Sequence, residues 1–218
     1  SKAQRAKNLH GARLQSGDPM NTLIQQLSNQ FAIPVIRHTD GPTLKNIALA
    51  LSRGGMKVLE ITVMSDAAYD VIRELSQDKN LVIGAGTILT AEHAQKAIDA
   101  GAKFLVSPGL DEGAVQYAHK RNIPFVPGVL TPTEVMRAHA LGCTLVKLFP
   151  IAAVRGPAYI KMLRAPFPQM KWMCTGGIAA EQAVGSKLPE VAGPGDRHDW
   201  WLGHRRVGIA LGGTRIRA

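Results

Sequence analysis

The sequence predicts an α/β protein, specifically a (β/α)8 TIM barrel, and two observations support this fold class. Short β-branched or apolar runs alternate with amphipathic segments of helical period, and the runs begin every 20 to 26 residues. Such an alternation is typical of βαβ units and a parallel sheet. Seven units can be counted, whereas an open doubly wound sheet usually has about five or six strands. A barrel of eight strands is therefore favoured.

The expected elements follow one another from a first helix at 20–30. The expected strands are 33–36, 58–63, 81–88, 104–106, 125–129, 145–149 and 171–174. The expected helices between them are 43–53, 66–76, 91–100, 112–121, 133–140 and 158–164. Gly54, Gly101 and Gly142 come just after the last turn of three of these helices, where a residue without a Cβ is favoured.

Both ends of the chain differ from this regular middle. Residues 1–19 have no period, so we interpret them as a leader segment or disordered arm that precedes one barrel domain at 20–218. Residues 191–218 form an atypical tail without a legible eighth unit, and a shifted reading frame or an erroneous sequence is one hypothesis for it. An intact mass equal to that of the stated sequence would remove that hypothesis. If the tail is real, the eighth strand is in doubt, and the first and seventh strands are expected to have exposed edges.

The composition excludes several classes of protein. The 218 residues include 26 Lys and Arg against 16 Asp and Glu, which gives a net charge of +10. Solvated basic termini explain this charge better than nucleic-acid binding, because the chain has 5% aromatic residues and no nucleic-acid motif. No run approaches the roughly 18 apolar residues that span a bilayer, so no membrane partner is expected. Cys143 and Cys174 have no CxxC spacing, which favours a reducing, cytoplasmic location.

Two ionisable residues are expected to share the interior of the barrel. Successive side chains of a strand alternate between its two faces. Leu59 and Ile61 form the face that packs on helices, so Glu60 is on the other face and points into the barrel. By the same alternation, Lys147 also points inward. Burial lowers the pKa of a lysine, and the neutral amine can attack a ketone to form a Schiff base. A neighbouring carboxylate can then move protons. A structural buried ion pair fits the same pattern, and both interpretations stay open at this point.

Glycine-rich turns close several expected strands, at 84–87, 107–109, 127–128 and 175–177. Main-chain N–H groups in the last of these turns could hold a phosphate, as barrel loops after strands seven and eight often do. Tight βα turns without a ligand are the alternative. The seven histidines form no HxH or HExxH pattern, and there is no GxGxxG or GxxxxGK[ST] loop. Neither a metal ion nor a nucleotide cofactor is therefore expected.

Five short motifs occur in order: VLEIT at 58–62, GAGT at 84–87, VSPG at 106–109, VKLFP at 146–150 and TGGI at 175–178. Together they resemble the 2-keto-3-deoxy-6-phosphogluconate (KDPG) and 4-hydroxy-2-oxoglutarate (KHG) aldolases. The resemblance implies a (β/α)8 barrel, a homotrimer, and class I catalysis through a lysine Schiff base without metal or cofactor. It also implies cleavage of phosphorylated KDPG to pyruvate and glyceraldehyde 3-phosphate, and of KHG to pyruvate and glyoxylate.

The resemblance further implies a role for each matching residue. Lys147 corresponds to the Schiff-base lysine and Glu60 to the general acid/base, while Arg37 meets anionic groups of the substrate. Other residues line the two ends of the substrate: Thr87, Pro108 and Phe149 at the pyruvoyl end, and Thr175, Gly176 and Gly177 at the remote phosphate or carboxylate.

The chain departs from the family pattern at two places. Some members carry an arginine where this chain has Met64, and Arg37 is expected to cover that role. The phosphate turn of the eighth strand is imitated by 212–214, but at a greater distance from Gly177 than in the family. Two other functions stay open: an aldolase for the galactonate epimer or another 2-keto-3-deoxy acid, and a catalytically silent, phosphate-binding barrel.

Overall fold

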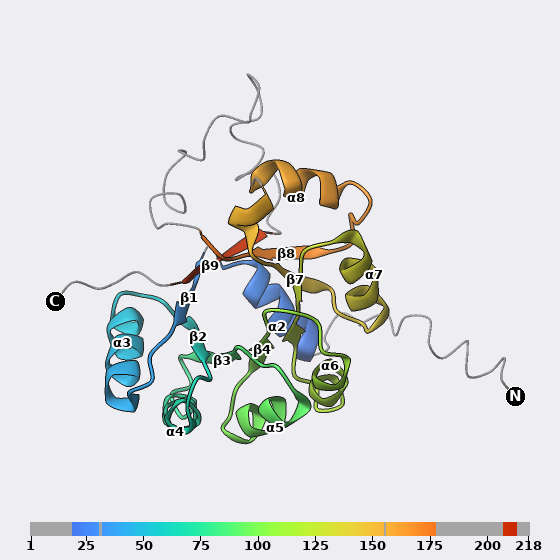
Figure 1. The fold of residues 1–218 in the computed structure, drawn as a ribbon. Coiled ribbons are helices and arrows are strands. Elements are labelled where there is room, and N and C mark those ends of the chain that lie inside the picture. The colour runs from blue at the N-terminus through green and yellow to red at the C-terminus, as the bar shows by residue number, and fades with distance from the viewer. Residues whose placement is uncertain (1–18, 31, 155, 178–206, 213–218) are drawn as a thin grey trace, which may run out of the picture.

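The computed structural model describes residues 19–30, 32–154, 156–177 and 207–212. Within them, one parallel sheet has the strand order β5-β4-β3-β2-β1-β9-β8-β7-β6. The two ends of this order, β5 (Phe125–Val126) and β6 (Gly128–Val129), are one stretch of chain that Pro127 interrupts. The sheet therefore closes on itself as a barrel of eight strands, and the predicted fold class is confirmed (Figure 1).

The elements lie where the sequence predicts them, with bounds that differ by at most two residues. The other strands are β1 (Ala32–Ile36), β2 (Val58–Thr62), β3 (Val82–Gly86), β4 (Phe104–Val106), β7 (Leu145–Leu148), β8 (Lys171–Cys174) and β9 (Val207–Gly212). The helices are α2 (Pro19–Ser28), α3 (Gly41–Arg53), α4 (Asp66–Leu75), α5 (Ala91–Asp99), α6 (Glu112–His119), α7 (Pro132–Ala140) and α8 (Pro157–Arg164). A short 3-10 helix, Ile151–Val154, follows β7.

The eighth strand of the barrel, β9, is the element that the sequence pattern did not predict. It pairs in parallel with β1, through Ala32 and Ile209 for example, and with β8, through Trp172 and Val207. The expectation of exposed edges at the first and seventh strands is therefore wrong. Strand pairing is made by main-chain groups, so a short run between glycines can close a barrel without a helix pattern beside it. Residues 178–206 and 213–218 lie outside the described residues, as do residues 1–18.

The core has two layers, one on each face of the sheet. Helices α3 to α8 lie around the outside of the barrel, and α2 lies inside the ring that they form (Figure 1). Leu59, Ile61, Val146 and Leu148 belong to the outer layer, between the strands and the helices. Ile24 and Leu27 of α2 instead join the interior layer with Val58, Phe104, Leu145 and Met173. Because three of those partners begin their strands, α2 closes the amino-terminal end of the barrel, and the carboxyl end remains for a site.

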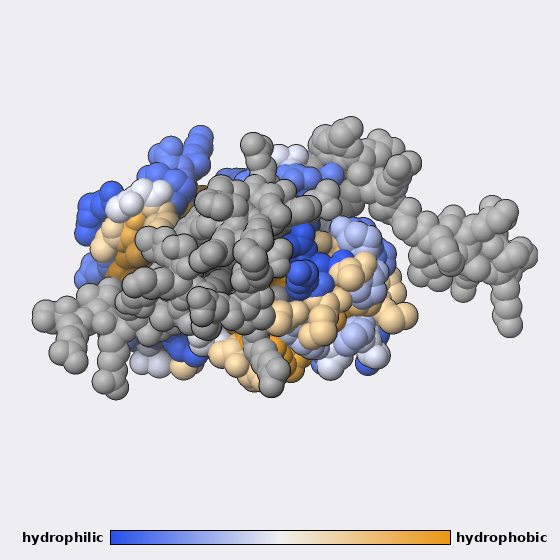
Figure 2. Space-filling model, turned by 90° about the horizontal axis from the view of Figure 1, so that it is seen from above, coloured by the Kyte–Doolittle hydropathy of each residue, from blue (hydrophilic) through white to orange (hydrophobic). Residues whose placement is uncertain are grey.

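The face of the molecule seen in Figure 2 carries both hydrophilic and hydrophobic residues. Figure 2 shows hydrophilic residues over much of the visible edge, with smaller hydrophobic areas between them. Among the described residues, the exposed large hydrophobic side chains are Met64, Leu89, Met136 and Met162. No helix within this part of the chain combines the length and apolarity that a membrane span requires.

Candidate active site

Strands β2 and β7 bring Glu60 and Lys147 into the barrel interior. Glu60 is 1% exposed and Lys147 is 8% exposed. Their strands are separated by β1, β9 and β8 in the sheet, so the two side chains face each other across the barrel. Oε2 of Glu60 is buried and has no hydrogen-bond partner among the described residues. A buried carboxylate oxygen of this kind is a ready acceptor for a hydroxyl or a water.

Burial and mutual charge set the protonation of this pair. Burial raises the pKa of Glu60, and the positive charges of Lys147 and Arg37 oppose that rise. Burial lowers the pKa of Lys147, while Glu60 opposes the fall and Arg37 adds to it. Desolvation therefore moves both groups toward their neutral forms. A neutral lysine can act as a nucleophile, and a carboxyl group with a raised pKa can carry a proton.

Gly86, at the end of β3, makes room for the carboxylate of Glu60. A Cβ atom at Gly86 would lie 2.0 Å from Oε1 of Glu60, a distance that no side chain can adopt without displacing the carboxylate. From the sequence, this glycine was expected only as part of a turn and of the GAGT motif. Its position inside the expected strand 81–88 is a signal of close approach by another group, and this signal could have identified it.

Arg37 is brought to the same site from the neighbouring strand. It follows the last residue of β1, and Val35 of that strand pairs with Glu60. Its side chain is exposed, yet its charge acts on both Glu60 and Lys147. Met64, where the family resemblance implies an arginine in some members, is 51% exposed. Arg37 is therefore a cation at the carboxyl end of the barrel that can meet an anionic substrate.

The residues predicted for the pyruvoyl end follow β3, β4 and β7. Thr87 has a φ of 63°, a left-handed conformation that is uncommon for a threonine and is frequent at functional sites. The carbonyl of Pro108 packs so closely on β6 that a Cβ atom at Gly128 would lie 2.1 Å from it. The ring centroid of Phe149 lies 5.0 Å from Nζ of Lys147. Phe149 is therefore directly beside the lysine, and Thr87 directly follows the glycine that accommodates Glu60.

The residues predicted for the remote end form the turn after β8. Thr175 is buried, and its carbonyl accepts a hydrogen bond of 3.0 Å from the N–H of Ile151. Gly176 and Gly177 have φ angles of 91° and 83°, which favour glycine. A Cβ atom at Gly176 would also lie 2.8 Å from the ring of Phe149. The turn is therefore held against the segment that follows Lys147. In the run 212–214, which resembles the family's phosphate turn of the eighth strand, Gly213 and Thr214 lie outside the described residues.

Neither thiol is suited to nucleophilic chemistry. Cys143 and Cys174 are buried, and burial raises the pKa of each to about 12. Within the stretches that the structure describes, no group of three or more His, Cys, Asp or Glu side chains could hold a metal ion. The charged groups that act on one another in the described site are Lys147, Glu60 and Arg37.

The comparisons with known proteins agree with this chemistry. Residues 23–186 match the family model of the KDPG and KHG aldolases. The chain belongs to the KDPG and KHG aldolase family. A relative is the 2-dehydro-3-deoxy-phosphogluconate aldolase of Haemophilus influenzae, which is 38% identical over 157 residues, 72% of this chain and 74% of the relative. The resemblance that the five motifs indicated is therefore confirmed.

Two solved structures of KDPG aldolases are similar over most of their length. The protein of Zymomonas mobilis ZM4, solved with 3-phosphoglycerate, superposes with a TM-score of 0.72 at 27% identity and covers 91% of this chain and 90% of that chain. The protein of Legionella pneumophila, solved with pyruvate as a covalent carbinolamine, has a TM-score of 0.70 at 29% identity. That match covers 84% of each chain.

Proposed function

We propose that this KDPG/KHG-family protein is a class I aldolase that cleaves KDPG to pyruvate and glyceraldehyde 3-phosphate. We propose the same chemistry for 4-hydroxy-2-oxoglutarate, which gives pyruvate and glyoxylate. Membership of the aldolase family makes the chain a carbon–carbon lyase. The observation that carries the proposal is the buried, electrostatically coupled pair of Glu60 and Lys147 inside the barrel. The carbinolamine of the Legionella pneumophila protein supports covalent chemistry on pyruvate.

Lys147 begins the reaction. Its neutral amine attacks the C2 ketone of the substrate, and the carbinolamine that forms loses water to give an iminium ion. Burial favours this step, because it lowers the pKa of Lys147 and so increases the fraction of neutral amine. The iminium then withdraws electrons from the C3–C4 bond.

Glu60 moves the protons. Directly or through a water, its carboxylate accepts the proton of the C4 hydroxyl as the C3–C4 bond breaks and the aldehyde leaves. An enamine of pyruvate remains on Lys147, and Glu60 returns a proton to C3 before hydrolysis frees pyruvate. Oε2 of Glu60, which has no hydrogen-bond partner in the part of the chain that the structure describes, supports this role, because it can accept a hydrogen bond from the substrate hydroxyl or a water.

The other predicted residues would bind the two ends of the substrate. Thr87, Pro108 and Phe149 would contact the pyruvoyl group beside Lys147, and the N–H groups of the 175–177 turn would hold the remote phosphate or carboxylate. Arg37 would supply positive charge to the substrate's anionic groups. We also propose a homotrimer in the cytoplasm. The family resemblance supports the trimer, which light scattering would test, and the unpaired cysteines support the compartment.

Trapping with pyruvate tests the proposal. The protein is incubated with pyruvate and borohydride, its intact mass is measured, and the adduct is mapped by peptide mass spectrometry. We expect one pyruvyl adduct, located on Lys147. It should be absent from Lys147→Ala and present in Lys103→Ala, which removes an exposed lysine before β4. A folded protein of the stated mass that forms no adduct would overturn the proposal.

The two alternatives have their own outcomes. Faster cleavage of the galactonate epimer than of KDPG would identify the chain as an aldolase for that substrate. Binding of a phosphorylated acid without any pyruvate adduct would identify a catalytically silent, phosphate-binding barrel.

A further inference from the structure

We propose that Thr62 is a positioning residue for Arg37, and that its hydroxyl thereby sets how tightly the enzyme binds the anionic end of its substrate. This inference rests on the proposed function, in which Arg37 meets an anionic group. It assigns a role to the last residue of β2 that neither the lysine chemistry nor the proton transfer uses.

Thr62 is a fully buried polar residue on the interior face of the barrel. It is 0% exposed and lies two residues after Glu60, so both side chains point to the same side of β2. A buried hydroxyl requires a hydrogen-bond partner. Oγ1 of Thr62 donates a hydrogen bond of 3.1 Å to the carbonyl oxygen of Ile36, on the neighbouring strand.

The acceptor places this hydrogen bond at the base of Arg37. The carbonyl of Ile36 and the N–H of Arg37 belong to one planar peptide unit. The paired register of β1 and β2 ends at Ile36 and Ile61, so Arg37 lies just beyond the last paired residues. The hydroxyl of Thr62 therefore extends the attachment of β1 to β2 by one residue and fixes the peptide from which Arg37 projects.

A second contact holds the same loop further along. Oγ of Ser65 donates a hydrogen bond of 3.1 Å to the carbonyl of Thr39, and Asp40 caps α3 by accepting a bond of 2.8 Å from the N–H of Thr43. Both of these contacts are exposed to water, whereas that of Thr62 is buried. A buried hydrogen bond is screened less by water, so the Thr62 contact is the stronger restraint on Arg37.

The hydroxyl acts through Arg37 rather than on the reacting atoms. Its proton is already donated to Ile36, so it is not available to a substrate oxygen. Pyruvate lacks the phosphate, and at saturating pyruvate and a pH where Lys147 is already neutral the charge of Arg37 no longer limits the amine, so under these conditions loss of the hydroxyl should leave its addition to Lys147 unchanged. Binding of a phosphorylated acid should be weakened, because the side chain of Arg37 would no longer project from a fixed peptide.

The test uses two substitutions at Thr62. Thr62→Val keeps the shape but removes the donor, and we expect about tenfold weaker binding of 3-phosphoglycerate by calorimetry, the effect of one hydrogen bond. KM for KDPG should rise about as much, while kcat and the rate of pyruvate trapping, measured at saturating pyruvate and a pH where Lys147 is neutral, stay within about twofold. Thr62→Ser keeps the hydroxyl and should restore binding.

A double variant and a matched control complete the test. Arg37→Leu should weaken 3-phosphoglycerate binding, and adding Thr62→Val to it should have no further effect, because Thr62 acts through Arg37. Ser76→Ala is the control: Oγ of Ser76 donates an equally long bond of 3.1 Å to the carbonyl of Gly101, away from the site. Ser76→Ala should bind 3-phosphoglycerate like the unmodified protein.

The outcomes separate this proposal from the proposed function. A protein that forms no pyruvate adduct refutes the aldolase, yet weaker 3-phosphoglycerate binding in Thr62→Val and its restoration in Thr62→Ser would still support the role of Thr62. The role is overturned if Thr62→Val binds 3-phosphoglycerate normally, or if it slows pyruvate trapping at saturating pyruvate and a pH where Lys147 is neutral. It is also overturned if the Thr62→Val and Arg37→Leu effects add.

Discussion

Glu60 and Lys147 occupy the interior of a barrel whose amino-terminal half is filled by apolar side chains. Desolvation of two such charges costs free energy, and their mutual attraction offsets it in part. The result is a carboxyl group with a raised pKa and an amine with a lowered pKa, and each group moderates the shift of the other. Removing one of the charges should therefore change the titration of its partner in a direction that the structure predicts.

The pH dependence of pyruvate trapping should move in opposite directions in two variants. Glu60→Gln removes the negative charge that raises the pKa of Lys147. The pKa of Lys147 should therefore fall, and the acid limb of the trapping rate against pH should move to lower pH. Arg37→Leu removes a positive charge that lowers the pKa of Lys147, so the acid limb should move to higher pH. The trapping rate is measured across the pH range, with Arg53→Leu on the outer helix α3 as the control. Shifts in the same direction for both variants would contradict this coupling.

Gly86→Ala should reduce activity far more than stability. The new Cβ would displace the carboxylate of Glu60, and a misplacement of about 1 Å can cost about a hundredfold in rate. Overpacking should lower the free energy of unfolding by about 1–3 kcal/mol. Cleavage assays and urea unfolding check both effects.

The matched control for this glycine is Gly113→Ala, in the first turn of α6. There a Cβ atom meets Oδ1 of Asp111 at an ordinary 3.4 Å, so both activity and stability should be retained. Full activity in Gly86→Ala would show that Glu60 does not need the space that the glycine provides.

At the scale of elements, the turns that begin the helices fix the loops at the carboxyl end of the barrel. The N–H of Glu134 donates a hydrogen bond of 3.4 Å to Oγ1 of Thr131. In return, Oε2 of Glu134 accepts hydrogen bonds of 2.8 Å from the N–H groups of Leu130 and Thr131. This capping box satisfies donors that the start of α7 would otherwise leave unpaired. The turn after β6 is therefore held by its own side chains.

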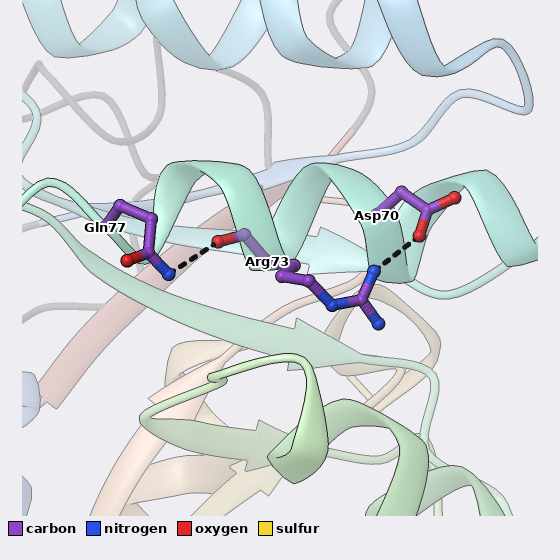
Figure 3. A network of polar contacts seen from close by, with 3 residues as sticks. All are labelled: Asp70, Arg73 and Gln77. Carbon is purple, nitrogen blue, oxygen red and sulfur yellow. Dashed lines mark hydrogen bonds and ion pairs between the residues drawn. The ribbon is translucent and has the colours of Figure 1, made fainter.

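The outer surface of α4 shows a weaker kind of contact. The guanidinium of Arg73 donates a hydrogen bond of 2.6 Å to the carboxylate of Asp70 (Figure 3). The main-chain carbonyl of Arg73 accepts a hydrogen bond of 3.2 Å from the side-chain amide of Gln77. These side chains are exposed, so water and salt compete with their interactions. They favour the helix but contribute little to the stability of the fold.

The difference between these two kinds of contact can be measured. Thr131→Ala removes the cap of α7 and should lower the free energy of unfolding by about 1 kcal/mol. Arg73→Ala removes an exposed ion pair, and its loss should change the free energy of unfolding by less than about 0.5 kcal/mol, apart from the effect of the different helix propensity of Ala. Urea unfolding gives both values, with Thr133→Ala, an exposed threonine in the first turn of α7, as the control. A larger loss in Arg73→Ala than in Thr131→Ala would refute this ranking.

At the scale of the whole molecule, β9 closes the barrel. It pairs with β1 along four residues and with β8 along three, so the edges of both neighbours are covered. A sheet edge that is left open exposes main-chain donors and acceptors to other chains. Closure therefore contributes both to stability and to resistance against aggregation.

Two truncations test this role of β9. Removal of residues 207–218 deletes β9 and should give a protein that aggregates or unfolds at a lower temperature, because β1 and β8 then have open edges. Removal of residues 213–218 keeps β9 and is the matched control. Size-exclusion chromatography and thermal unfolding compare the two. Equal behaviour of both truncated chains would show that the barrel does not depend on β9.

The sequence by itself determined much of this architecture. The alternation of apolar and polar residues along 58–63 and 145–149 determined that Glu60 and Lys147 point inward, because a strand side chain's direction depends on its parity along the strand. The repeated strand and helix patterns determined the first seven units, because each unit carries its own local periodicity. The five motifs determined the family.

Tertiary structure alone decided the remaining features, because they depend on residues far apart in the sequence. The eighth strand is defined by its pairing with β1 and β8, and the interruption at Pro127 appears only where β5 and β6 pair with different neighbours. Gly86 makes room for Glu60, and Thr62 reaches the carbonyl before Arg37, because parallel pairing brings β3 and β1 beside β2. The local alternation of residues determines to which face of a strand a side chain points. Which residues it then contacts depends on the pairing of distant strands in the closed sheet.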